Sequence, residues 1–269
     1  METCSVCKSK VVADAARGCG TCFKLVEAIK TVVADEAKSE IVRRRQNINV
    51  LEPPETFDRE VFWKQMVGCL CSSNQRVGPG RPVSLFLLRD PFPLSLLTCE
   101  KQHAKGQGVL EFYAHQEIQR AGVNYSFQIP KRLVWNLDLL QNRHGWSEME
   151  VQSKALARIP RNAAAAECIE IERKAAHVAM EMHGIGPKQS RNLWICLGLT
   201  RYEIPLDGRV TKWFNEKQTS FIEKKNLRRS HDYEATEDRI QSLCKEANVF
   251  PCLFDAAAFI SEEKPSRNK

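Results

Sequence analysis

The stretch Met182–Lys188 forces one helix to end and another to begin, and it constrains the fold more than any other part of the chain. An apolar stripe with the spacing of one helix face leads into it, formed by Ile171, Ala175, Val178 and Met182. Gly184 and Gly186 supply a turn with positive φ, which other residues resist, and Pro187 suits the first position of a new helix. The stretch therefore predicts two helices joined by a tight hairpin, with Lys188 at the start of the second.

The sequence of this hairpin predicts that it can bind an anion. Unpaired backbone N–H groups around Gly184 and Gly186 form a small concave site that a phosphate can fill. The partial positive charge at a helix start also favours a neutral amine on Lys188, and a neutral amine is a nucleophile that can form a Schiff base. The alternative interpretations are an ordinary turn that contains glycine and a surface lysine at a helix start.

Asp207 lies nineteen residues after Lys188, far enough for one short helix and a return of the chain. A carboxylate at this point can stabilise positive charge that develops on a sugar when a glycosidic bond breaks. Asp207 is followed by Gly208 and also fits the cap of the next helix. The two roles are compatible.

Helical periodicity recurs along the chain and strand-like alternation is nearly absent, so we expect an all-α fold. Charged residues dominate 215–234, which we interpret as a solvated loop before a helix capped by Thr236. The net charge of +7 fits an anionic partner without selecting nucleic acid. No apolar run could span a bilayer, and the N-terminus lacks the pattern of a secretory signal. Eleven cysteines without an export signal indicate reduced thiols, and we expect a cytoplasmic, nucleoid-associated protein.

Four cysteines near the N-terminus form two CxxC pairs, Cys4 with Cys7 and Cys19 with Cys22. Each pair can place two thiolates on one metal ion, and four thiolates complete a tetrahedral zinc site. We therefore expect a Cys-rich zinc module at residues 1–22, structural because no position stays open for catalysis. An iron–sulfur cluster and a segment that binds no metal are the alternatives.

Three segments resemble motifs of the helix-hairpin-helix DNA glycosylase superfamily, and especially its lysine-containing branch, the 8-oxoguanine DNA glycosylase and endonuclease III types. The hairpin with Lys188 resembles the catalytic hairpin, and Pro205-Leu206-Asp207 resembles the segment with the catalytic aspartate. Upstream, Cys71-Ser72-Ser73-Asn74 resembles the helix end that enters the emptied base site. The spacing from lysine to aspartate agrees with the 8-oxoguanine type, and the resemblance covers about residues 56–262.

The resemblance implies two helical subdomains with a DNA-binding cleft between them and a helix-hairpin-helix motif at about 170–198. Together with the breaks in the sequence, it divides the chain into five parts. These are the Cys-rich module 1–22, an N-terminal helix at 23–55 that packs with the C-terminal subdomain, a helical-barrel subdomain at 56–205, the C-terminal subdomain 206–262 and a disordered tail at 263–269.

The resemblance also implies a bifunctional DNA glycosylase and AP lyase of base-excision repair, which excises a flipped-out damaged base such as 8-oxoguanine. Lys188 would attack the sugar C1′ and form a Schiff base that permits β-elimination, while Asp207 would activate the lysine and stabilise the oxocarbenium-like charge. The implied DNA contacts are Gly184, Gly186, Asn74, Gln75 and Arg209, and the implied base-pocket residues are Asn192, Asp255 and Phe259.

Damaged double-stranded DNA is the implied partner. The protein is expected to be a monomer and to have no membrane partner. The resemblance further implies catalysis without a cofactor and a monovalent cation bound at the hairpin, as is often found in this superfamily.

The chain departs from the family pattern at three points. His183 stands where the family often has proline, and Asn192 stands where one subfamily has a base-stacking cysteine. Only Cys244 and Cys252 follow Asp207, so the four-cysteine iron–sulfur loop of the endonuclease III type is absent. Two alternatives therefore stay open: a glycosylase for oxidised pyrimidines or alkylated bases, and a non-catalytic helix-hairpin-helix DNA-binding adaptor.

Overall fold

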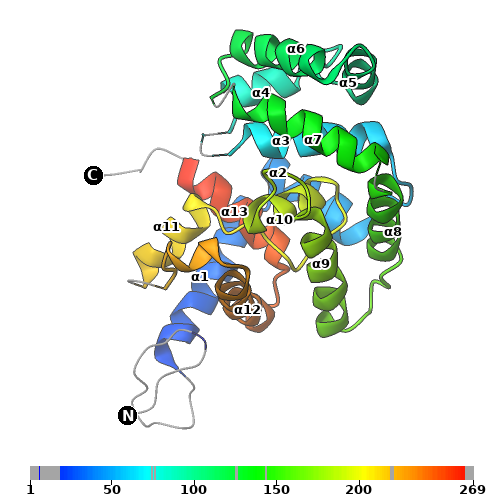
Figure 1. Cartoon of the computed structure of the whole chain (residues 1–269). Helices are drawn as coiled ribbons and strands as arrows, with labels where there is room; N and C mark the ends of the chain where they lie inside the picture. The colour runs from blue at the N-terminus through cyan, green and yellow to red at the C-terminus, as the bar shows by residue number, and fades with distance from the viewer. Residues whose placement is uncertain are drawn as a thin grey trace. The chain divides into compact units, whose positions relative to one another are not determined.

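Helices form all the regular structure of the described part of the chain in this computed structural model (Figure 1). The structure describes residues 6, 19–73, 75, 77–124, 127–142, 144–218 and 221–263. The prediction of an all-α fold is confirmed. Among the described residues, no helix combines the length and the apolar character that a bilayer span requires.

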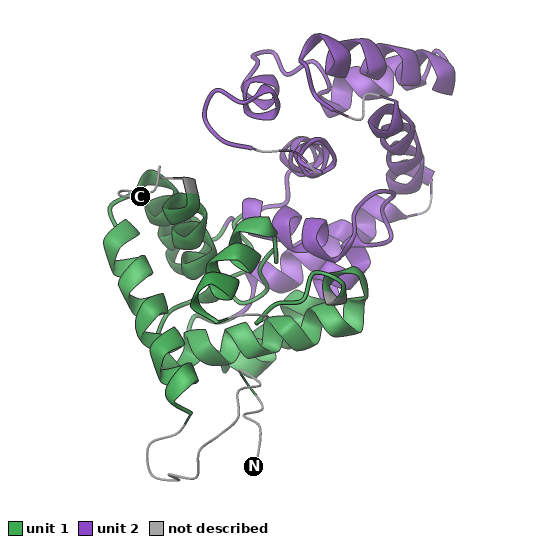
Figure 2. Ribbon diagram, turned by 90° about the vertical axis from the view of Figure 1, so that its left-hand side faces the viewer, with its two compact units in different colours: residues 1–53, 160–173, 198–269 green, residues 54–159, 174–197 purple. Residues whose placement is uncertain are grey.

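The chain divides into two units, shown in Figure 2. Unit 1 comprises residues 1–53, 160–173 and 198–269, and unit 2 comprises residues 54–159 and 174–197. The division expected from the sequence groups two segments differently, because it assigns 160–173 and 198–205 to the helical barrel. Both belong to unit 1, where their polar side chains bond to each other and to the C-terminal helices. The expectations for residues 1–22 and 263–269 fall largely outside the described residues.

Unit 1 is built around its last helix, α13 (Pro251–Glu263), which packs against α1, α2, α11 and α12. The other elements of this unit are α1 (Gly20–Glu36), α2 (Glu40–Arg45), the π-helical turn η1 (Gln46–Leu51), α11 (Gly208–Lys217), the 3-10 turn η2 (Asn226–Arg228) and α12 (Ser230–Glu246). Small and apolar residues cover most of α13, as expected of a helix that is surrounded by others. Phe254 of α13 contacts the rings of Trp213 and Phe214 at centroid distances of 4.9 and 5.3 Å.

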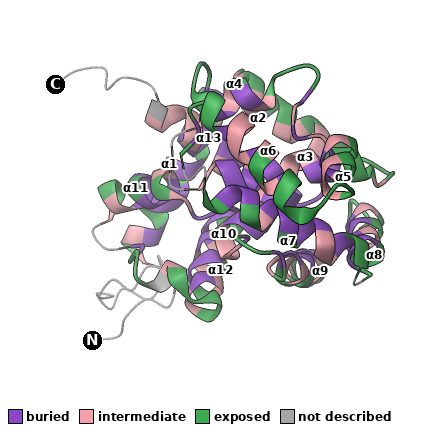
Figure 3. Ribbon diagram, turned by 45° about the horizontal axis from the view of Figure 1, so that its top comes forward, coloured by how far each residue is buried: buried purple, intermediate pink, exposed green. Residues whose placement is uncertain are grey.

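Unit 2 is built around α3 (Arg59–Cys71), which packs against α4, α5, α7 and α10. Its helices are α3, α4 (Pro82–Leu87), α5 (Leu96–His103), α6 (Gln107–Arg120), α7 (Gln128–Asn142), α8 (Gly145–Ala157), the end of α9 (Ala165–Ala179) and α10 (Pro187–Cys196). Phe62 of α3 lies in ring contact with Trp146 of α8 at 5.9 Å and Trp194 of α10 at 5.8 Å. Trp194 also donates to the Ala175 carbonyl at 2.8 Å, which ties α10 to α9. Most of α10 is buried (Figure 3).

Helix α12 begins at Ser230, seven residues before the start that the sequence suggested. The prediction that Thr236 caps this helix is wrong, because Thr236 lies within it and is buried. Tyr233, Glu237 and Ile240 share its buried face with Cys244. A glutamate at a buried position interrupts the apolar stripe, so the sequence pattern concealed the first turns.

Candidate functional site

The predicted hairpin spans the residues between the end of α9 at Ala179 and the start of α10 at Pro187. Gly184 has φ of +84°, and a Cβ there would come within 2.6 Å of the Arg132 side chain and 2.9 Å of Leu70. Both the backbone conformation and the close approach therefore require glycine. Gly186 is different: it has extended φ/ψ, caps α10, and its Cβ position has open space within 4 Å.

A single buried amide fixes the position of this hairpin. Asn136 of α7 is fully buried, and its Oδ1 accepts from the His183 N–H at 2.7 Å. Its Nδ2 donates to the His183 carbonyl at 3.1 Å. The amide therefore pairs both backbone groups of a residue that lies outside either helix.

A second link joins the start of α10 to the end of α3. Gln189 is buried next to Lys188, and its Nε2 donates to the Ser73 hydroxyl at 3.1 Å and the Ser72 hydroxyl at 3.4 Å. Both serine hydroxyls donate in turn to the Cys69 carbonyl at 3.1 and 3.3 Å. The helix turn that carries Lys188 is thereby tied to the helix end that the sequence singled out.

Lys188 and Asn192 both lie by the buried thiol of Cys69. Burial raises the pKa of this thiol well above its usual range, and the positive charge of Lys188 acts against that rise. Asn192 donates to the Cys69 sulfur at 3.5 Å and accepts from the Cys196 thiol at 3.7 Å. Unit 2 thus brings the predicted nucleophile and one predicted pocket residue to a single face of α10.

Of the two residues expected to enter the duplex, Asn74 lies outside the described residues. Gln75 is half-buried, and its side chain donates to the Cys71 carbonyl and accepts from the Asn124 N–H at 3.3 Å. The structure therefore holds Gln75 against the end of α3 and the loop that follows α6.

Unit 1 carries Asp207 at the start of α11. Its Oδ1 accepts from the N–H groups of Arg209 at 2.8 Å and Val210 at 3.0 Å, so Asp207 is the helix cap that the sequence allowed. Its Oδ2 lies 3.6 Å from the Arg209 guanidinium, which lies over the Phe259 ring at 3.9 Å. Asp255 lies one turn before Phe259 on α13. The structure thus gathers Asp207, Arg209 and Phe259 into one group.

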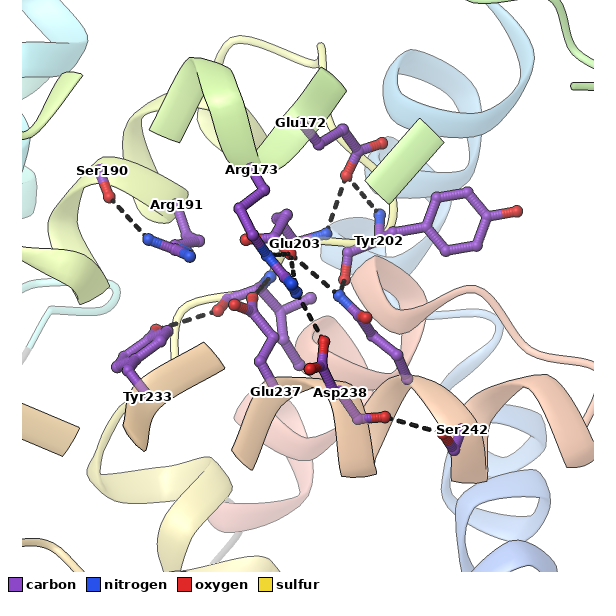
Figure 4. Close-up of polar contacts among 12 residues, drawn as sticks. Glu172, Arg173, Ser190, Arg191, Tyr202, Glu203, Tyr233, Glu237, Asp238 and Ser242 are labelled. Atoms are coloured by element: carbon purple, nitrogen blue, oxygen red, sulfur yellow. Dashed lines mark hydrogen bonds and ion pairs between the residues drawn. The ribbon is translucent and has the colours of Figure 1, made fainter. Parts of the chain in front are cut away.

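The segment that leads to Asp207 is irregular and buried. Glu172 of α9, which is 1% exposed, accepts from the N–H groups of Arg201, Tyr202 and Glu203 at 3.0, 2.8 and 2.8 Å (Figure 4). Arg173 binds Glu203 at 2.9 Å and Asp238 of α12 at 2.7 Å.

Two side chains of α12 also bind the backbone of the segment that leads to Asp207. Glu237 accepts from the Ile204 N–H at 2.6 Å. The Tyr233 hydroxyl accepts from the Leu206 N–H at 2.6 Å and donates to the Ile204 carbonyl at 3.1 Å.

The predicted metal ligands are only partly described. Cys19 caps α1 and Cys22 lies in its first turn, while Cys4 and Cys7 lie outside the described residues. Within the described ranges, no three His, Cys, Asp or Glu residues gather as a metal site would require. The zinc module stays a prediction.

Sequence reasoning missed Asn136, Gln189, Glu172, Tyr233 and Glu237. Asn136 had a detectable signal, because it follows the spacing of the apolar stripe of α7, with Leu133 and Leu140 one turn away. A polar residue at such a position must find a buried partner. The identity of that partner depends on tertiary structure.

We expect Asn136→Leu to lower the free energy of unfolding by about 1–3 kcal/mol, because it removes both hydrogen bonds between this buried amide and the backbone of His183. Urea denaturation provides the measurement. Gln141→Leu, an exposed position on the same helix, is the matched control and should stay within about 0.5 kcal/mol. Equal losses for the two variants would show that Asn136 does not support the hairpin.

Burial raises the pKa of Glu172 from 4.5 to about 7, against the opposing effect of three backbone N–H groups. A carboxyl with a raised pKa contributes stability fully below pH 4.5, and that contribution is lost as the pH rises through 7. The difference in unfolding free energy between wild type and Glu172→Gln should therefore fall by about 3 kcal/mol over this range. Urea denaturation at several pH values checks this, and a difference that is constant with pH would contradict it.

No family model matches the chain, and no curated protein matches it. Its structure is similar to the crystal structure of the 8-oxoguanine DNA glycosylase of Thermotoga maritima, with a TM-score of 0.57 and 11% sequence identity. The match covers 91% of this chain and 98% of that chain. At this identity the likeness shows a shared fold, so the fold that the sequence motifs implied is confirmed.

Proposed function

We propose that this protein is a DNA glycosylase with AP lyase activity that excises a damaged base, with 8-oxoguanine as its preferred substrate. The observation that carries the proposal is Lys188 in the first turn of a helix that is fixed to α3 through Gln189. A lysine at a helix start can act as a nucleophile on DNA, because the same helix start attracts a DNA phosphate. The fold shared with an 8-oxoguanine DNA glycosylase supports the same activity.

The hairpin is proposed to hold a DNA phosphate. Among the described residues, the N–H groups of Lys188 and Gln189 have no backbone acceptor, and the space beside Gly186 is open. A phosphate that accepts from these groups would position the strand without contacting a base. A monovalent cation bound to the hairpin carbonyls could complete the contact.

The proposed reaction begins when the damaged nucleotide leaves the duplex. The neutral amine of Lys188 attacks C1′, and the glycosidic bond breaks with its electron pair leaving on the base, which is then protonated. Loss of a proton from the attached nitrogen and opening of the sugar ring give a Schiff base. Removal of a C2′ proton then expels the 3′ phosphate by β-elimination. The Asp207 carboxylate assists activation of the lysine and stabilises the positive charge on the sugar.

The remaining roles follow the same proposal. Asn74 and Gln75 would fill the gap left in the duplex or contact the orphaned base, and Asn192 and Asp255 would contact the flipped base. Phe259 would stack on that base with one face. The guanidinium of Arg209 lies beside the Asp207 carboxylate and over the Phe259 ring, and this favours support of the pocket wall over a phosphate contact.

Borohydride trapping on duplexes with 8-oxoguanine, thymine glycol or an abasic site tests this function. The wild-type chain should form a covalent complex, and Lys188→Gln should form none. Asp207→Asn should slow base release by about 100-fold or more. Lys105→Gln, at an exposed position of unit 2, is the control and should behave as the wild type.

A complex that survives Lys188→Gln would contradict the proposed nucleophile. Normal DNA binding without a trapped complex on any lesion would support the non-catalytic adaptor. Trapping only on thymine glycol would retain the mechanism and change the substrate to an oxidised pyrimidine.

We propose further that Cys4, Cys7, Cys19 and Cys22 bind one structural zinc ion. Cys19 and Cys22 fit this role, because they lie three residues apart at a helix start, where thiolates are favoured. Elemental analysis of the reduced protein should find about one zinc per chain, and the double variant Cys4→Ser, Cys7→Ser should lose it. Cys196→Ser, outside the module, should retain it. Wild-type protein without zinc or iron would contradict the module.

A further inference from the structure

The eight residues 200–207, called the strap from here on, have no helical structure and yet are mostly buried. Buried N–H groups need acceptors, and a helix would supply them from its own backbone. In the strap, the acceptors are side chains of other helices. Glu172 of α9 accepts from the N–H groups of residues 201–203. Glu237 of α12 accepts from the N–H of Ile204, and Tyr233 of α12 accepts from that of Leu206.

Every N–H group from 201 to 207 is thereby accounted for. Pro205 has no N–H, and the N–H of Asp207 donates to the Pro205 carbonyl at 2.9 Å. The carbonyl of Ile204 accepts from Tyr233, and that of Tyr202 accepts from Gln241 at 3.2 Å. The backbone of the strap is therefore held along its whole length up to Asp207.

Tyr233 stands out within this arrangement, because its hydroxyl is fully buried and bonds on both sides of Pro205. It pairs the residue directly before Asp207 and the residue directly before the proline. Tyr233 thus supports the turn that leads to Asp207, and the side chain of Asp207 in turn caps α11.

We infer that Tyr233 is a positioning residue for Asp207 and, with Glu172 and Glu237, sets the place of the Asp207 carboxylate for the reaction. This inference rests on the proposed role of Asp207. Removal of the Tyr233 hydroxyl leaves the Leu206 N–H without its acceptor and the Ile204 carbonyl without its donor. A shift of about 1 Å in a reacting group can slow catalysis by about 100-fold.

A double-mutant cycle between Tyr233→Phe and Asp207→Asn tests the inference. Single-turnover base release and the Kd for the lesion duplex are measured for wild type, both single variants and the double variant. Tyr233→Phe should lower the rate about 10- to 100-fold with Kd changed less than about threefold. In the Asp207→Asn background, the same substitution should lower the rate by no more than about twofold, because the carboxylate to be positioned is gone.

Tyr202→Phe is the matched control, because it removes a hydroxyl from the strap itself that bonds to no described residue. Its rate should stay within about twofold of the wild type. Circular dichroism and the unfolding midpoint show whether each variant is folded. If Tyr233→Phe does not fold, Glu172→Gln replaces it, since glutamine keeps one acceptor oxygen, and the same non-additivity with Asp207→Asn is expected.

Additive effects of Tyr233→Phe and Asp207→Asn would overturn the inference and leave the role of Asp207 intact, because Tyr233 would then act through general stability. An unchanged rate for a folded Tyr233→Phe would overturn it as well. An unchanged rate for Asp207→Asn would instead reject the proposed function of Asp207, and with it the inference.

Discussion

Backbone outside a helix must find hydrogen-bond partners, and this constraint applies to both segments that lead to the predicted catalytic residues. A helix satisfies its own interior N–H and C=O groups. The hairpin before Lys188 makes several backbone bonds within its own turns, and Asn136 supplies the partners of His183. In the strap before Asp207, side chains of neighbouring helices supply most of the partners. Asn136 pairs both backbone groups of His183, and Glu172, Glu237 and Tyr233 pair the strap.

This solution has an energetic cost and a mechanical benefit. Each buried polar side chain must be desolvated, and each unmade hydrogen bond would cost about 1–3 kcal/mol of a total stability of about 5–15 kcal/mol. In return, these hydrogen bonds fix the conformation of irregular backbone as firmly as helical bonds fix a helix. Lys188 lies in the first turn of α10, just after the hairpin, and Asp207 is the last residue of the strap. Each proposed functional group therefore lies next to a loop that side chains of other helices hold in place.

The sequence alone predicted the parts of the site that depend on local rules. Glycine at a positive φ and proline at the first helical position gave the hairpin, and the spacing of apolar residues gave the helical fold. It could not predict Glu172, Tyr233 or Glu237, because their partners lie about thirty residues away in the chain. Glu237 even obscured the start of α12, since a buried glutamate breaks the apolar pattern from which helices are recognised.

The boundaries of the two units could not be predicted from local sequence patterns either. The chain passes from unit 1 to unit 2 within α9, between Arg173 and Lys174, where no proline, glycine or change of composition marks the sequence. Arg173 makes ion pairs with Glu203 and Asp238, which both belong to unit 1. Such pairs become visible only when distant helices are placed beside each other.

The central claim is that Lys188 forms the covalent bond to DNA. The most direct measurement is peptide mapping by mass spectrometry of the wild-type chain after borohydride reduction in the presence of an 8-oxoguanine duplex. The account predicts a deoxyribose-derived adduct on the peptide that contains Lys188, with fragment ions that assign it to the Nζ of that residue. An adduct on another lysine or on the N-terminal amine, with Lys188 unmodified, would contradict it.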